Sequence, residues 1–242
     1  MDAILGRLSH YAQISEGDVE GLAKLPHAIV TRGPGQTIVT VGEAVTQVFV
    51  IEEGWAMRHR MLSDGRRQIV NFMVPGDCFD LQALVNAKAD HYVSTLTSVR
   101  LRTAPAAQFL AAVRARPTLA TAFWWAAVQE ESILREQIVR IGRRTARERV
   151  AHLILELHRR LLQTGAAKTD TLTLPLTRET MADSLGLSAV HISRTLSALR
   201  ARKLIEATGR TIRLSDPTGL ARLAHFNEAY LHLNAPRLPA DL

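Results

Sequence analysis

The chain has 242 residues, of which 22% are charged and 47% hydrophobic, a composition typical of a globular protein, and at this length we expect two domains. It has no apolar run of about 18 residues, and its start lacks the basic and apolar regions of a signal peptide, so we expect a cytoplasmic protein outside the membrane. A single cysteine excludes an internal disulfide and an iron–sulfur cluster held by four thiolates of this chain.

The net charge of +7 is unevenly distributed. Residues 140–242 contain 17 Lys and Arg against 9 Asp and Glu, whereas residues 1–139 contain 13 against 14. This asymmetry favours a neutral half joined to a basic half that meets a polyanion. A solvated basic surface without a ligand is the alternative.

The N-terminal half is predicted to be rich in strands. Two helices are expected before residue 27, the second opened by Ser15 with Asp18 three residues later. From Ala28 to Ala104, short β-branched segments alternate with turns. The expected strands are 37–41, 47–51, 56–61, 68–73, 78–81, 92–97 and 99–103. Many short strands at this spacing predict a small antiparallel barrel or jelly roll.

Four polar residues near the expected barrel mouth are candidates for an effector pocket: Arg67, Asp80, His91 and Tyr92. None has a distinctive spacing, and ordinary strand connections or a hydrogen-bonded structural histidine are the alternatives. A metal-binding enzyme of the same shape would need clustered histidines with a glutamate on adjoining strands. The segment Met57–Arg60 offers only His59, so we expect no metal site.

The longest helical pattern runs from Thr118 to Ile141. Its apolar stripe includes Phe123, Ala127, Leu134, Ile138 and Ile141. A stripe this broad can pack on its own barrel and also on a second copy, which predicts a parallel helix pair; core packing alone is the alternative. The segment 142–144 is expected to break this stripe at a hinge, where Gly142 relaxes the helix. Another helix, 145–162, and an extended segment, 171–176, follow.

The stretch Thr177–Leu199 predicts two short helices around a tight turn. Thr177 and Ser188 are the expected N-caps, and Gly186 is the expected left-handed residue after the first helix. One face of the second helix is apolar; the opposite face carries Ala189, Val190, His191, Ser193 and Arg194. This is the helix-turn-helix plan, whose second helix enters the major groove of DNA. An ordinary helical hairpin is the alternative.

Two further strands, 203–207 and 211–214, are expected to form a wing. Thr208 and Arg210 near its tip are candidates to contact the DNA backbone. The tail is expected to begin with a helix, 218–233, and to end in a mobile, Pro-interrupted stretch. The resulting α+β plan has a sensory β-barrel domain at 1–117, a dimerisation helix at 118–142 and a winged-helix DNA-binding domain at 143–242.

In this order of domains, and over roughly residues 28–214, the chain resembles the Crp/Fnr family of bacterial transcription regulators. The most specific segments are Asp64–Val70 with Pro75–Asp77, Arg147–Ala151, and Leu174–Arg178 through Ser193–Leu196. The resemblance implies a homodimer that senses a signal in the barrel and sets two recognition helices on a pseudo-palindromic operator in double-stranded DNA, with RNA polymerase as a further candidate partner. It also implies that Arg178 and Ser188 hold phosphates, that Ser193 lies at the DNA and that Arg194 reads a base.

The chain departs from the family at two places. Where the best-known members have a glutamate in the reading turn, this chain has Val190, so its operator should differ from theirs. Nucleotide-binding members carry a Gly-Glu-Leu stretch and an Arg-Ser pair, where this chain has Phe79–Leu81 and Ala89–Asp90. Without that arginine a cyclic phosphate lacks its counter-ion, so we expect no usual response to cyclic AMP.

The sequence therefore predicts a dimeric, sequence-specific transcription regulator whose effector is unidentified. Haem stays open as a cofactor, because one Cys or His can ligate it. The alternative is a signalling subunit whose winged helix binds a protein partner. An enzyme is not expected, because the sequence contains no recognisable nucleophile, metal cluster or phosphate loop.

Overall fold

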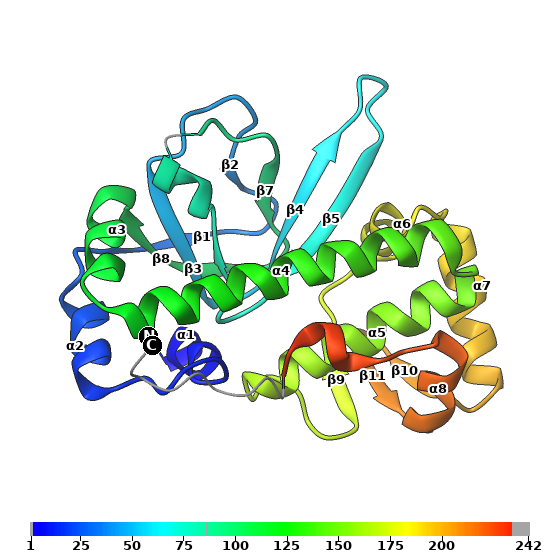
Figure 1. Cartoon of the computed structure of the whole chain (residues 1–242). Helices are drawn as coiled ribbons and strands as arrows, with labels where there is room; N and C mark the ends of the chain where they lie inside the picture. The colour runs from blue at the N-terminus through cyan, green and yellow to red at the C-terminus, as the bar shows by residue number, and fades with distance from the viewer. Residues whose placement is uncertain (1, 86, 234–242) are drawn as a thin grey trace. The chain divides into compact units, whose positions relative to one another are not determined.

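The computed structural model describes residues 2–85 and 87–233, and within them strands dominate the first half of the chain and helices the second (Figure 1). The fold is α+β, as predicted. The chain divides into two compact units. One comprises the described residues up to His59, Phe72–Glu131, and His232 with Leu233; the other comprises Arg60–Asn71 and Ser132–Leu231. No helix in the described part of the chain is both long and apolar enough to span a membrane.

The barrel strands form two four-stranded antiparallel sheets. Their order is β1-β8-β3-β6 in one sheet and β2-β7-β4-β5 in the other. Their bounds are β1 Ala28–Arg32, β2 Thr37–Val39, β3 Gln47–Glu53, β4 Ala56–Met61, β5 Arg67–Met73, β6 Cys78–Phe79, β7 Tyr92–Thr95 and β8 Val99–Pro105. A short 3-10 helix, η1 (Leu81–Val85), follows β6. Strand β1 was not expected from the sequence.

Strand β3 is apolar on both faces because it separates two cores. Ile51 is buried in the barrel interior, and Phe49 packs against the same cluster, with its ring stacked 5.1 Å from that of Phe79. Val48 and Val50 point the other way, into a cluster made with the N-terminal helices. Successive side chains of a strand face opposite sides, so this alternation assigns each residue to one core.

Four helices cover the outer side of β3. They are α1 (Asp2–Leu8), α2 (Glu16–Lys24), α3 (Ala106–Arg114) and the first part of α4 (Pro117–Arg143). Ser15 caps α2 in a reciprocal pair with Asp18, as predicted. Helix α3 was not expected from the sequence; its Phe109 meets Phe123 of α4 edge to face at 4.9 Å.

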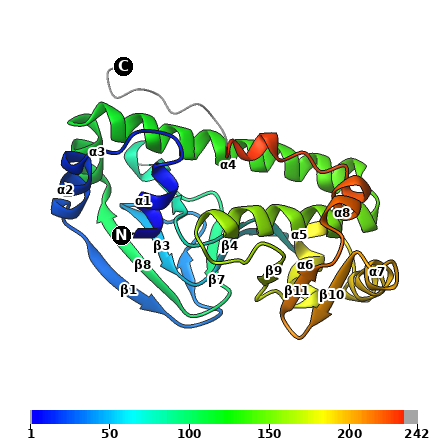
Figure 2. The same ribbon diagram turned by 90° about the horizontal axis from the view of Figure 1, so that it is seen from below.

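The second unit is built around α5 (Ala146–Gln163). Val150, Leu153, Ile154, Leu157 and Leu161 of α5 are all buried, as the stripe predicts. The other elements are β9 Thr171–Thr173, α6 Arg178–Leu185, α7 Ala189–Ala201, β10 Ile205–Thr208, β11 Thr211–Leu214, α8 Pro217–Ala224 and η2 Glu228–Leu231. The strands form a small antiparallel sheet in the order β10-β11-β9, beside α5 (Figure 2). This sheet is the expected wing with one added strand.

Two predicted boundaries differ from the structure. The break that the sequence places at 142–144 lies at Arg144 and Thr145: α4 continues through Gly142 to Arg143, and α5 starts after Thr145, whose amide donates to Glu148 Oε2 at 2.8 Å. The tail helix ends at Ala224 instead of residue 233, because His225 takes a left-handed conformation with φ 49°. The chain then turns into η2. The Pro-interrupted end of the chain lies outside the described residues.

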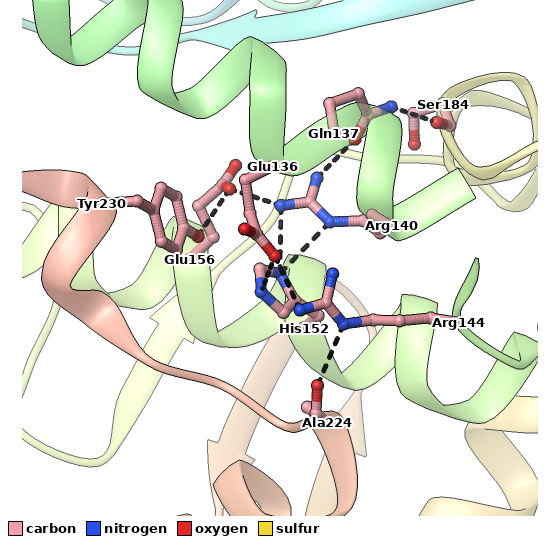
Figure 3. Close-up of polar contacts among 9 residues, drawn as sticks. All are labelled: Glu136, Gln137, Arg140, Arg144, His152, Glu156, Ser184, Ala224 and Tyr230. Carbon is pink, nitrogen blue, oxygen red and sulfur yellow. Dashed lines mark hydrogen bonds and ion pairs between the residues drawn. The ribbon is translucent and has the colours of Figure 1, made fainter. Parts of the chain in front are cut away.

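A buried arginine joins the end of α4 to α5 (Figure 3). The side chain of Arg140 is 3% exposed and forms an ion pair with Glu156, which is 4% exposed. Arg140 also donates to Gln137 Oε1 at 2.6 Å. Tyr230 of η2 donates its hydroxyl to Glu156 Oε2 at 2.8 Å, so the segment after α8 completes the cluster. Each charge in it therefore has partners, as a dry interior requires.

His152 occupies the centre of the same cluster. Its Nδ1 accepts from Arg140 Nε at 3.2 Å, and its Nε2 lies 3.1 Å from Glu136 Oε1. Arg144 pairs with the same carboxylate at 2.6 Å and donates to the carbonyl of Ala224 at 3.1 Å. Burial, followed by repulsion from Arg140 and Arg144, lowers the pKa of His152 to about 2. The imidazole is therefore neutral in the folded chain.

Removing the charge of Glu156 should destabilise the second unit strongly. In a Glu156→Gln variant Arg140 stays buried without its counter-ion, and we expect the free energy of unfolding to fall by about 3 kcal/mol. The matched control is Asp170→Asn, which breaks a solvent-exposed pair with Arg213 and should lower the stability far less. Urea unfolding measures both. Equal losses of unfolding free energy in the two variants would contradict a stabilising role of the buried Arg140–Glu156 pair.

His152 should also make stability depend on pH. An unfolded histidine titrates near pH 6.5, far above the folded value of about 2, so between them the unfolded chain binds more protons. The stabilisation is complete above about pH 6.5 and is lost as the pH falls, by up to about 1.4 kcal/mol per pH unit. Urea unfolding between pH 7 and 5 should therefore show a shallower pH dependence in His152→Gln than in wild type. An unchanged slope in His152→Gln would refute the argument.

Candidate nucleic-acid interface

The turn between α6 and α7 is fixed by three short-range features. The Thr177 hydroxyl accepts from the amide of Thr180 at 3.0 Å and caps α6. Gly186 ends α6 with φ 64°, a left-handed conformation that glycine adopts without strain. The Ser188 hydroxyl accepts from the amide of His191 at 3.2 Å and caps α7. These three sequence predictions are confirmed.

Helix α7 has one buried and one exposed face. Ile192, Leu196 and Leu199 are buried and hold the helix in the core. On the other side Val190 is 60% exposed. Ser188, His191, Ser193 and Arg194 are exposed too, and Ala189 is half-buried. The surface formed by residues 188–194 is called the α7 face below.

The α7 face forms one wall of an open groove. The groove is lined by Thr145, Ala146, Arg147, Glu148, Ser188, Val190, His191, Arg194, Thr195, Ala198 and Leu223. Its second wall is the first turn of α5, whose leading amides carry the positive end of the helix dipole. The sequence indicated Arg147 only through family likeness, and neither Thr145 nor Arg147 was expected at the interface. The sequence signal that could have predicted their place at the interface is the N-cap residue Thr145 followed two residues later by the basic Arg147.

Three other predicted interface residues lie on exposed positions of the same unit. Arg178 is the first residue of α6. Thr208 and Arg210 flank Gly209 at the turn between β10 and β11. All three can therefore meet a ligand without any change of the core.

The inner side of α6 is contacted by the β4–β5 hairpin and by α4. Arg67 forms an ion pair with Asp183 at 2.8 Å. Gln68 and Gln137 donate to the carbonyl of Ser184 at 3.4 and 2.6 Å. Arg67, which the sequence pattern placed with the effector-pocket candidates, thus has its partner on the helix-turn-helix.

Two of the other pocket candidates, Asp80 and His91, contact each other in the barrel. Nε2 of His91 lies 3.1 Å from Asp80 Oδ1, and its Nδ1 lies 2.7 Å from Asp90 Oδ1. Arg58 pairs with Glu130 and approaches Asp80 Oδ1 at 3.9 Å. Asp80 is buried and has φ 61°, which is uncommon for a residue other than glycine.

The third candidate, Tyr92, lies at the start of β7 opposite His59 of β4. Its ring stacks on that of His59 at 5.4 Å, and His59 Nε2 is 3.0 Å from Ser94 Oγ. Among the residues that the structure describes, no group of three or more His, Cys, Asp or Glu side chains is placed to hold a metal ion.

Two protein-family models match the chain. The cyclic nucleotide-binding domain matches residues 30–116, and the Crp-like helix-turn-helix domain matches residues 148–223. The second match contains the α7 face and the wing.

Two transcription regulators are similar to most of the chain. The nitrogen fixation regulation protein FixK of Bradyrhizobium diazoefficiens is 34% identical over 192 residues, which cover 78% of this chain and 79% of that protein. The transcriptional activatory protein AadR of Rhodopseudomonas palustris is 32% identical over 81% of this chain and 80% of that protein. The chain belongs to the Crp/Fnr family of transcription regulators.

A solved structure supports the same assignment. FixK2 from Bradyrhizobium japonicum has a TM-score of 0.74 and 27% identity to the chain, and the match covers 82% of this chain and 98% of that one. This Crp/Fnr protein is therefore a DNA-binding regulator and not an enzyme, and its Crp-type helix-turn-helix is the DNA-binding element. The segment Ala224–Leu231 lies beyond the family model of that domain. It contributes Tyr230 to the buried cluster of Arg140, His152 and Glu156, called the Arg140 cluster below.

Proposed function

We propose that this Crp/Fnr regulator binds a pseudo-palindromic operator as a homodimer and reads its sequence with the α7 face. The observation that carries the proposal is the exposure of Val190, His191, Ser193 and Arg194 on a helix whose other face is buried. A recognition helix presents its N-terminal residues to base edges in the major groove, and these four residues lie in its first two turns.

Each side chain has a chemical role in this proposal. Arg194 can form two parallel hydrogen bonds to guanine, which makes it the base-reading residue. Ser188 caps α7 with its lone pair, so its O–H is available to donate to a phosphate. Arg178, Thr208 and Arg210 contact the backbone on either side, with Ala189 and Ser193 close to the groove floor.

The dimer is proposed to form along α4. Trp124 and Ile138 lie fourteen residues apart, two heptads, and are 70% and 68% exposed in the single chain. Ala127 and Leu134 lie between them in the same stripe, Ile141 continues it, and all three are half-buried. Pairing two copies of α4 would cover this stripe and present two α7 helices to half-sites about 34 Å apart. Such a regulator would act in the cytoplasm, with RNA polymerase as a further partner.

The barrel is proposed to have lost the usual response to cyclic AMP. Arg58 is paired with Glu130, and the carboxylates of Asp80 and Asp90 flank His91. A cyclic phosphate entering this region would have to displace Glu130 and would meet two further negative charges. The polar set Asp80, His91 and Tyr92 is a better match for a neutral or cationic effector.

Replacing Arg194 and Arg178 separately should distinguish base reading from backbone binding. Arg194→Ala should flatten sequence selection from random duplexes while the protein still binds DNA. Arg178→Ala should weaken binding to all sequences alike and reduce the slope of log K against log salt by about one for each phosphate that is no longer neutralised.

The oligomeric state and the folding of both variants, from sedimentation and circular dichroism, should match wild type. An Arg194→Ala protein that selects the wild-type operator with undiminished preference would exclude the base-reading role.

A further inference from the structure

Val190 is a large apolar side chain exposed on the α7 face beside the polar side chains of Ser188, His191 and Arg194. It is 60% exposed, although its neighbour Ile192 is completely buried. A single exposed valine is common on protein surfaces and by itself indicates nothing. Val190, however, lines the groove together with Ser188, His191 and Arg194.

The position of Val190 relative to Arg194 is set by the helix. The two residues are four apart in α7, so their side chains are neighbours on one face. One helical turn advances about 5.4 Å, whereas successive base pairs are about 3.4 Å apart. If Arg194 contacts a guanine, Val190 faces an edge one or two base pairs away.

Valine has only methyl groups to offer to that edge. In the major groove the sole apolar group is the 5-methyl of thymine, and every other base edge presents a donor or acceptor. Pressing a valine against those edges would remove water without supplying a hydrogen bond, which is unfavourable. Valine is also held in one preferred rotamer in a helix, so its methyl groups are placed with little loss of side-chain entropy.

We propose that Val190 reads a thymine methyl group one or two base pairs from the guanine contacted by Arg194. The inference rests on the proposed function, because it requires α7 to lie in the major groove. It specifies the operator further: each half-site contains a thymine whose methyl group, and not its hydrogen-bonding pattern, is recognised.

The experiment starts with the operator that wild-type full-length protein selects from random duplexes. Each thymine of the half-site is then replaced by deoxyuridine, which removes the methyl group and keeps the base pair. At one position this change should weaken wild-type binding about fourfold, the effect of burying one methyl group. In Val190→Ala the same replacement should change the dissociation constant less than about twofold, since the shorter side chain no longer reaches the thymine methyl group.

Two further variants sharpen the test. Val41→Ala removes an exposed valine of the barrel and should leave the fourfold effect of uridine unchanged. Val190→Glu introduces an acceptor, and selection with this variant should replace the thymine by cytosine, whose amino group can donate to it.

The outcomes separate the two levels of the proposal. A wild-type protein that selects no sequence overturns the proposed function and the inference with it. A protein that selects an operator but tolerates uridine at every thymine overturns the inference alone. So does a Val190→Ala variant whose binding weakens fourfold on the same replacement, because the methyl group would then be read by another residue.

Discussion

The Arg140 guanidinium is a charge that α4 places out of contact with water, and the geometry of the second unit depends on satisfying it. Its hydrogen-bond partners are Glu156 and His152 of α5 and Gln137 of its own helix. Tyr230 adds a hydrogen bond from the segment after α8. Because an unpaired buried charge costs several kcal/mol, α5 is held at one angle and register to the end of α4.

The same helix α5 supports the proposed DNA-binding surface. The buried stripe of α5 packs against α7, and its first turn forms one wall of the groove beside the α7 face. Gln137, which precedes Arg140 by three residues in α4, donates to the carbonyl of Ser184 in α6. The Arg140 cluster therefore connects the proposed dimerisation helix to α5 and α6 through hydrogen bonds, and α7 follows through its packing against α5. A rearrangement of α4 that moved Arg140 would be transmitted to both helices of the motif.

Local signals made much of this structure predictable. Caps at Ser15, Thr177 and Ser188 and the left-handed Gly186 follow from side-chain chemistry within three residues, and the apolar stripe of α5 follows from helical periodicity. The Arg140 cluster was not predictable, since Glu156 and Tyr230 are 16 and 74 residues from their respective partners Arg140 and Glu156. Helix α3 lacks a side-chain cap, and Gly142 stays helical, with the boundary between α4 and α5 falling at Arg144 and Thr145. Arg67 was assigned from the barrel pattern alone, which cannot reveal its ion pair with Asp183.

The central claim is that two α7 faces enter successive major grooves on one side of a duplex. Methylation protection at guanine N7, which lies in the major groove, tests it on the operator that the protein selects. We predict two protected patches on the duplex, centred about one helical turn apart, and their loss in Arg194→Ala. A single patch, or bound DNA with all guanine N7 atoms still reactive, would contradict the account.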